Sequence, residues 1–191
     1  GDVLQAFRSY WKEALTRPEQ VDHAENKLFG TLRKRMGRSD VPTFDALATE
    51  LEARLKKEGW WSLQGRTGQL RELMLWRSQT AQPYRVTLPE GPFVTDVVLL
   101  NEFASLGWGD YATCGKRGAG GWATRDRLFA VVPRYSSIDG EEFRVTFLGH
   151  ETQHFVDLRR WPALAPWRLE YRAKLVELAQ VDQTRRRVLT K

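Results

Sequence analysis

Residues 147–158, FLGHETQHFVDL, contain two of the chain's three histidines within five positions, and a glutamate directly follows the first of them. On a helix, His150 and His154 lie one turn apart on the same face, where two imidazole nitrogens can reach one metal ion at about 2.0 to 2.1 Å. Glu151 lies about 100° further round, where its carboxylate can address a water on the metal without binding the ion itself. The alternative is a pair of core histidines satisfied by neighbouring carboxylates.

A catalytic zinc ion takes a third protein ligand and leaves its fourth position open. We predict Glu170 as that ligand, because Pro166 can begin a second helix that folds back on the first and points this carboxylate at the same ion. Glu177, one helical repeat further on, is the main alternative. Cys114 is another, since a thiolate binds zinc well, although YATCGKRG lacks the Gly-Cys-Leu context of the peptide deformylases. The third histidine, His23, is predicted to lie on the surface.

These residues resemble the gluzincin metallopeptidases, the thermolysin-like group, whose third ligand is a glutamate on the helix after the H-E-x-x-H helix. His150, Glu151 and His154 match that motif fully, and Glu170 and Ala173 match the looser E-x-x-small pattern around the third ligand. The resemblance implies a Zn²⁺ cofactor, Glu151 as the general base, and hydrolysis of a peptide or protein substrate.

The resemblance covers roughly residues 119–180 and implies a zincin-like fold for that part of the chain. The segment GGWAT is similar to the family's substrate-binding edge strand, and LFAVV to the strand beside it. Gly121, Trp122 and Ala123 are therefore expected to hold an extended peptide by strand addition. The resemblance says nothing about residues 1–80.

The chain departs from the family's pattern at two places. Lys174 stands where the family has an aspartate that orients a histidine, so we expect Asp157 to accept a histidine N–H, with Glu177 as the alternative. No histidine follows His154, although the family uses a later histidine to stabilise the oxyanion. The candidates for that role, chosen by closeness in sequence, are Tyr135, Tyr171 and Arg172.

The elements that must position these residues follow from the spacing of apolar side chains. Residues 2–80 have helical spacing almost throughout, and a helix is predicted for GQLRELMLWRSQ, residues 68–79. After Gln82 the chain changes to short runs rich in β-formers, at 84–88 and 93–100, divided by the turn signal PEGP. A hairpin of two further strands, about 120–124 and 127–133, precedes the histidines.

The predicted fold class is therefore α+β, with N-terminal helices packed on a small mixed sheet, then an active-site helix and a ligand helix. The predicted organisation is a helical portion over residues 1–82 and a zincin-like catalytic portion over 83–191, together forming one compact unit. The leading function is a zinc metallopeptidase. The alternative is a non-catalytic binding or scaffold protein whose metal is structural or absent.

Composition restricts the partners and the location. The net charge is +6, but only residues 33–38 and 185–187 concentrate basic side chains, which favours a solvated face and no nucleic-acid partner. No apolar run approaches the roughly 18 to 20 residues of a membrane helix, so we expect a soluble chain without a membrane span. Because the sequence begins at Gly1, we leave open whether a signal peptide has been removed. Compartment and oligomeric state are left undecided.

Overall fold

The computed structural model describes residues 1–182 and residue 189, and the chain divides into two compact units. The first unit contains residues 1–78 and 102–118, and the second contains residues 79–101 and the described chain from Ala119 onwards. The expected division at residue 82, within one compact unit, stays a prediction: the chain first passes between the two units after residue 78, and residues 102–118 return to the first unit. The basic run 185–187 lies outside the described residues.

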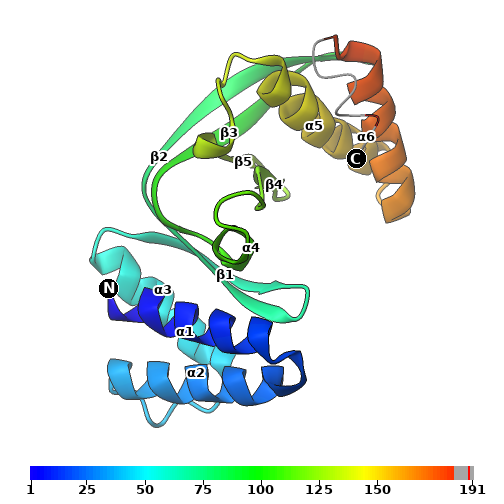
Figure 1. The fold of residues 1–191 in the computed structure, drawn as a ribbon. Coiled ribbons are helices and arrows are strands. Elements are labelled where there is room, and N and C mark those ends of the chain that lie inside the picture. Colours follow the sequence, from blue (N-terminus) through cyan, green and yellow to red (C-terminus); the bar gives the residue numbers. More distant parts are fainter. Residues whose placement is uncertain (183–188, 190–191) are drawn as a thin grey trace. The chain divides into compact units, whose positions relative to one another are not determined.

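Three helices begin the chain, strands follow with one short helix among them, and two long helices end the described part, as labelled in Figure 1. The α-helices are α1 (Asp2–Thr16), α2 (Val21–Met36), α3 (Phe44–Lys57), α4 (Trp108–Ala112), α5 (His150–Arg160) and α6 (Pro166–Gln180). The strands are β1 (Trp61–Thr67), β2 (Leu70–Leu88), β3 (Gly91–Leu106), β4 (Gly121–Ala123) and β5 (Leu128–Val131). Shorter helical segments are η1 (Pro18–Gln20), η2 (Val132–Arg134) and the π-helix η3 (Glu142–Gly149).

In the first unit, helices α1, α2 and α3 share one apolar core with the start of β2. Thr43 begins α3 as its N-cap, because its hydroxyl accepts a hydrogen bond from the Ala46 N–H at 3.3 Å. Helix α1 is tied to β2 at a single residue: the Trp11 indole donates to the Arg71 carbonyl, and the Arg71 N–H donates to the Tyr10 hydroxyl. These two hydrogen bonds join α1 to the strand, and the shared apolar core holds α2 and α3.

The helix expected over residues 68–79 is wrong, because residues 68 and 69 form a turn and residues 70–79 belong to β2. Thr67 pairs with Leu70 around a two-residue turn, and Gly68 supplies that turn with a positive φ of 61°. The run Leu73–Trp76 is buried on both faces, and such a short apolar run gives the same pattern in a buried strand as in a buried helix. The segment of β1 also has helical spacing of its apolar residues, so the sequence did not indicate this strand either. Its pairing with β2 is what makes the segment from Leu70 onwards a strand.

A five-stranded mixed sheet runs in the order β1-β2-β3-β5-β4. Strand β5 lies parallel to β3 and antiparallel to β4, and β4 forms one edge of the sheet. The expected strands at 84–88 and 93–100 and the expected hairpin before the histidines are confirmed. The α+β class is therefore confirmed as a combination of helices with a mixed sheet.

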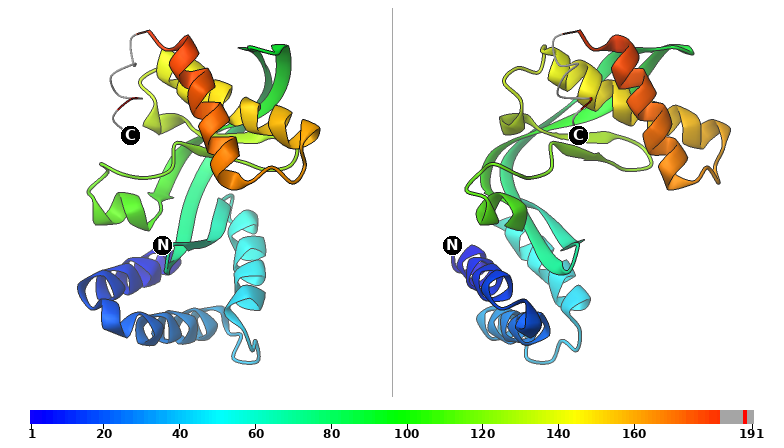
Figure 2. Two further views of the ribbon diagram at one scale, coloured as in Figure 1. Left: turned by 90° about the vertical axis from the view of Figure 1, so that its right-hand side faces the viewer. Right: turned by 45° about the vertical axis from the view of Figure 1, so that its right-hand side comes forward.

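In the second unit, η3, α5 and α6 cover the apolar core formed with the end of β2, the first part of β3 and β5. Phe143 and Phe147 of η3 and Val176 of α6 are buried in this core. Helices α5 and α6 lie side by side in both views of Figure 2, and α6 begins at Pro166 as expected. The predicted active-site helix and the following helix are thus neighbours in space.

Gly121 in β4 lies where no side chain fits. A Cβ atom there would lie inside the van der Waals radii of the Phe129 carbonyl oxygen and the Phe147 ring. The missing side chain therefore lets the edge strand approach η3, the helical segment that runs directly into α5. The glycine has a structural role in addition to any contact with a substrate.

We expect Gly121→Ala to lower the free energy of unfolding by about 1 to 3 kcal/mol, the usual cost of overpacking. Urea unfolding followed by circular dichroism measures the change. Gly149→Ala is the matched control, because a Cβ there meets neighbours only at 3.6 Å in a helical conformation. That control is expected to be neutral or more stable by up to about 1 kcal/mol. Equal losses in the two variants would contradict the close-approach argument.

Candidate metal centre

Helix α5 places His150 and His154 on one face, one turn apart. The π-helix η3 runs directly into α5 at His150, and π-helical turns are frequently found at functional sites. The opposite face of α5 is anchored in the unit, where the buried hydroxyls of Thr152 and Thr95 lie 3.2 Å apart. Since α5 is fixed on its buried side, the direction of the two imidazoles is fixed as well.

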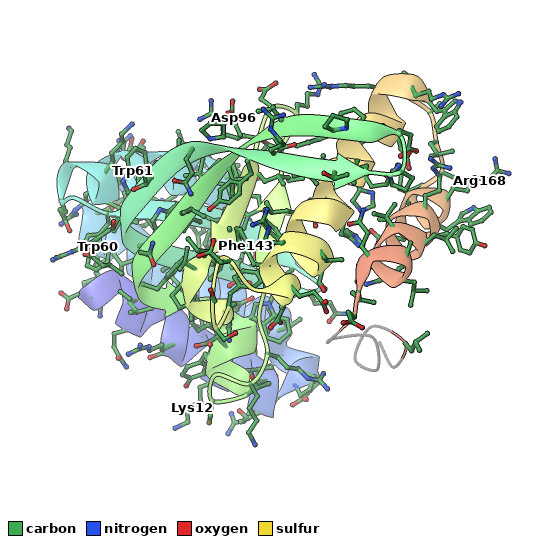
Figure 3. The ribbon with its side chains drawn as sticks, turned by 90° about the horizontal axis from the view of Figure 1, so that it is seen from above. Lys12, Trp60, Trp61, Asp96, Phe143 and Arg168 are labelled. Atoms are coloured by element: carbon green, nitrogen blue, oxygen red, sulfur yellow. The ribbon has the colours of Figure 1, made fainter. Side chains whose placement is uncertain are left out.

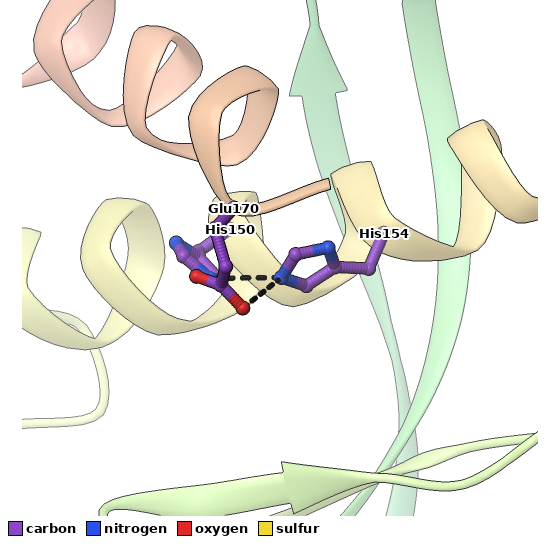
Figure 4. A group of neighbouring side chains, drawn as sticks. All are labelled: His150, His154 and Glu170. Atoms are coloured by element: carbon purple, nitrogen blue, oxygen red, sulfur yellow. Dashed lines mark hydrogen bonds and ion pairs between the residues drawn. The ribbon is translucent and has the colours of Figure 1, made fainter. Parts of the chain in front are cut away.

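Glu170, in the second turn of α6, brings its carboxylate to both histidines (Figure 4). Its oxygens lie 3.3 Å from Nε2 of His150 and 3.5 Å from Nε2 of His154, and the two Nε2 atoms are 2.9 Å apart. Two ligands about 2.0 to 2.1 Å from a tetrahedral ion would lie about 3.4 Å from each other. The spacing of the three donor atoms is therefore close to that of one zinc ion's ligands.

Glu177 binds the other nitrogen of His150. One oxygen of this fully buried carboxylate pairs with Nδ1 of His150 and accepts a hydrogen bond from Lys174 Nζ at 2.7 Å. A carboxylate on Nδ1 holds the proton there and leaves the lone pair of Nε2 directed at Glu170 and His154. Glu177 therefore fixes the orientation of the His150 ring, and Glu170 faces the other ring nitrogen.

Charge and burial set the protonation of these groups. Burial lowers the pKa of His154, and His150 lowers it further, which favours the neutral imidazole that a metal needs. Burial raises the pKa of Glu177, but the hydrogen bonds from His150 and Lys174 outweigh it and hold that pKa below its ordinary value. Burial also raises the pKa of Glu151, and the carboxylates of Glu170 and Glu177 add to this effect against that of His150.

The donor set fits zinc. Two imidazole nitrogens and one carboxylate are a common protein ligand set of catalytic zinc sites, and the ligand atoms of the three residues all lie within 4.8 Å of one another. The Glu170 side chain is 63% exposed, whereas the histidine side chains are 11% and 13% exposed. The cluster is thus buried on the α5 side and open to solvent on the α6 side, which gives an ion a route of entry.

The role expected for Asp157 is wrong. This buried carboxylate accepts hydrogen bonds from Gln153 Nε2 at 2.9 Å and from Arg172 Nε at 2.8 Å, so its partners are not histidines. Arg172 also reaches Glu90 at 3.0 Å, in the turn between β2 and β3. Asp157 therefore ties α5 to α6 and so helps to hold Glu170 in place. Sequence reasoning did not find Glu90, because no local pattern marks so distant a contact.

The three candidates for oxyanion stabilisation lie in different surroundings. The Tyr135 hydroxyl donates to the Gly120 carbonyl at 3.0 Å, and its pKa is raised by burial and by the nearby charges of Glu142 and Glu151. Tyr171 is 60% exposed. Arg172 is held by Asp157 and Glu90, so we do not retain it for this role. Tyr135 is the candidate that lies within electrostatic reach of Glu151.

The other predicted residues do not belong to the cluster of His150, His154 and Glu170. Trp122 of β4 stacks on Phe129 of β5 with ring centroids 5.3 Å apart, and β4 has a sheet neighbour on one side in the described chain. Cys114 is exposed and lies in the first unit, while Glu170 lies in the second. His23 is exposed on α2, as expected for a surface residue.

No family model matches this chain, and neither does any curated protein or solved structure. Among the described residues, no helix is long and apolar enough to cross a membrane. The site must therefore be interpreted from its own geometry.

We expect Glu177→Gln to weaken zinc binding by about 10- to 100-fold, as is usual when a ligand's hydrogen-bonding partner is altered. The substitution keeps the shape but removes the charge that holds the proton on Nδ1 of His150. Competition with a chromophoric chelator measures the affinity, and circular dichroism checks the fold. An unchanged affinity in a folded variant would show that Glu177 does not orient the ligand.

Proposed function

We propose that this chain is a zinc metallopeptidase with a zincin-like arrangement in its second unit. One observation carries the proposal: the donor atoms of His150, His154 and Glu170 converge at 2.9 to 3.5 Å from one another. Glu151 follows the first histidine directly on the same helix. The proposal also draws on the resemblance of the H-E-x-x-H motif and Glu170 to the gluzincins.

His150, His154 and Glu170 would hold the ion. When bound there, zinc acidifies water and polarises a carbonyl group. Glu151 accepts a proton from the attacking water on its carboxylate and later passes it to the leaving amine. Burial holds the pKa of Glu151 above its ordinary value, which makes this carboxylate a stronger base for the proton.

The substrate is proposed to be an extended peptide. Strand β4 forms an edge of the sheet within the described chain, so an incoming strand would add beside it. Gly121 brings this edge close to Phe147, three residues before His150. Gly121, Trp122 and Ala123 would then align the peptide. Tyr135 is the candidate for stabilising the oxyanion, and its hydroxyl would turn away from the Gly120 carbonyl to donate to that oxyanion.

Metal analysis combined with a peptide assay tests the proposal. The purified chain should contain about one zinc per molecule. It should also cleave members of a panel of unstructured peptides, and a chelator should stop that cleavage. Zinc without cleavage by the chain would favour the alternative, a binding or scaffold protein with a structural metal. Absence of both would remove the proposal.

A further inference from the structure

The connection between α5 and α6 carries an exposed aromatic and basic surface, which we call the hairpin tip, residues 158–171. Leu158, Trp161, Trp167 and Tyr171 are 41%, 38%, 65% and 60% exposed. The turn between these helices adds exposed Pro162, Ala163 and Pro166. So many exposed large apolar side chains within one short stretch are unusual on a protein surface, where such side chains are normally scattered singly.

The hairpin tip is also positively charged. Arg159, Arg160 and Arg168 are exposed, and within the described part of the chain none of them forms an ion pair. Glu170 is its one acidic residue. Figure 3 labels Arg168 at the end of the α5–α6 hairpin, with its side chain directed away from the ribbon. A partner of this surface must therefore accept both cations and apolar side chains.

Arginine side chains make cation–π contacts with the two tryptophans of the hairpin tip. The guanidinium carbons of Arg160 and Arg172 lie 4.7 and 5.0 Å from the ring of Trp161, and that of Arg168 lies 5.1 Å from the ring of Trp167. Single-stranded nucleic acid needs open aromatic faces on which its bases can stack. These rings are partly covered by cations, so the arrangement favours a partner that contacts ring edges and phosphates together.

We propose that the hairpin tip docks onto an anionic phospholipid surface. Tryptophan and tyrosine prefer the interface between headgroups and acyl chains, and arginines bind the phosphate groups beside them. The tip is a turn between two helices, so it can enter the headgroup layer without any helix crossing the membrane. The inference is independent of zinc. Because Glu170 follows Arg168 by two residues, docking places the candidate metal centre next to the lipid.

Co-sedimentation with vesicles tests this inference. The probe is phosphatidylcholine vesicles with about one third phosphatidylglycerol, compared with phosphatidylcholine alone, at low and high salt. We expect binding to the anionic vesicles, much weaker binding to neutral ones, and release at high salt, since exposed charges are screened there. No sedimentation with anionic vesicles at low salt would overturn the inference.

Variants locate the binding surface. Trp167→Ala should weaken binding by about 10-fold, and Arg159→Gln with Arg168→Gln by about 20- to 30-fold, at roughly five-fold for each charge. The matched controls are Trp61→Ala, at a tryptophan that is 39% exposed in the first unit, and Arg8→Gln with Arg85→Gln. Binding reduced equally by the controls would reflect general basicity and overturn the assignment.

Single-stranded RNA and DNA oligonucleotides are added as competitors. If they bind more tightly than the vesicles and the variants of the hairpin tip abolish that binding, the partner is nucleic acid and the lipid proposal is wrong. Circular dichroism of each variant checks that it is folded. Because none of these substitutions falls on His150, Glu151, His154 or Glu170, the result does not depend on the peptidase proposal.

Discussion

We expect Glu151→Gln to keep its fold and its zinc and to lose about 10² to 10⁴ of the peptidase rate, or more where the same group also protonates the leaving amine. The reason is that Glu151 is not among the three residues whose donor atoms converge. The amide that replaces its carboxylate cannot take a proton from water. Initial rates on the cleaved peptides, measured at matched zinc occupancy, give the size of the loss.

The control for Glu151→Gln is Glu52→Gln, the same chemical change at an exposed position on α3. It should leave both rate and zinc content unchanged. A chelator blank identifies contaminating proteases. If the wild type and Glu151→Gln cleave equally well at equal zinc content, the proposed mechanism is wrong.

His154→Ala is expected to reduce bound zinc from about one per chain to a small fraction, with an affinity loss greater than the 10- to 100-fold typical of outer partners. His154 is the better of the two histidines to replace, because its Nδ1 makes no hydrogen bond to the described residues. Removing His150 would instead leave Glu177 buried without its histidine partner and would disturb the fold. Metal analysis after dialysis measures the outcome.

The matched control for this variant is His23→Ala, which removes an exposed histidine from α2. It should keep its zinc, because His23 lies in the first unit and the three converging residues lie in the second. Zinc retained in full by a folded His154→Ala would rule out the proposed ligand set. Zinc lost from both variants would point to a site elsewhere in the chain.

The local part of this protein could be predicted from the sequence. The period of a helix fixes where side chains one turn apart point, so His150 and His154 were placed on one face of a helix without any tertiary information. Pro166 at the start of the next helix and the turn signals of the two hairpins are similarly local, and all of them match the structure. Glu170 was the favoured partner because short connections make neighbouring helices antiparallel.

Contacts between distant segments were decided only by the tertiary structure. The apolar residues of segment 68–79 fall at helical spacing and predict a helix, but a short buried apolar run fits a strand equally well. Pairing with β1 makes the segment from Leu70 onwards a strand. Asp157 and Glu177 were both plausible partners for a histidine. Because α6 packs against α5, Glu177 pairs with Nδ1 of His150, and Asp157 accepts a hydrogen bond from Arg172. Glu90, in the turn between β2 and β3, also accepts a hydrogen bond from Arg172. Helical spacing determines the face of a helix on which a side chain lies, whereas the partners of that side chain depend on how helices and strands pack against one another.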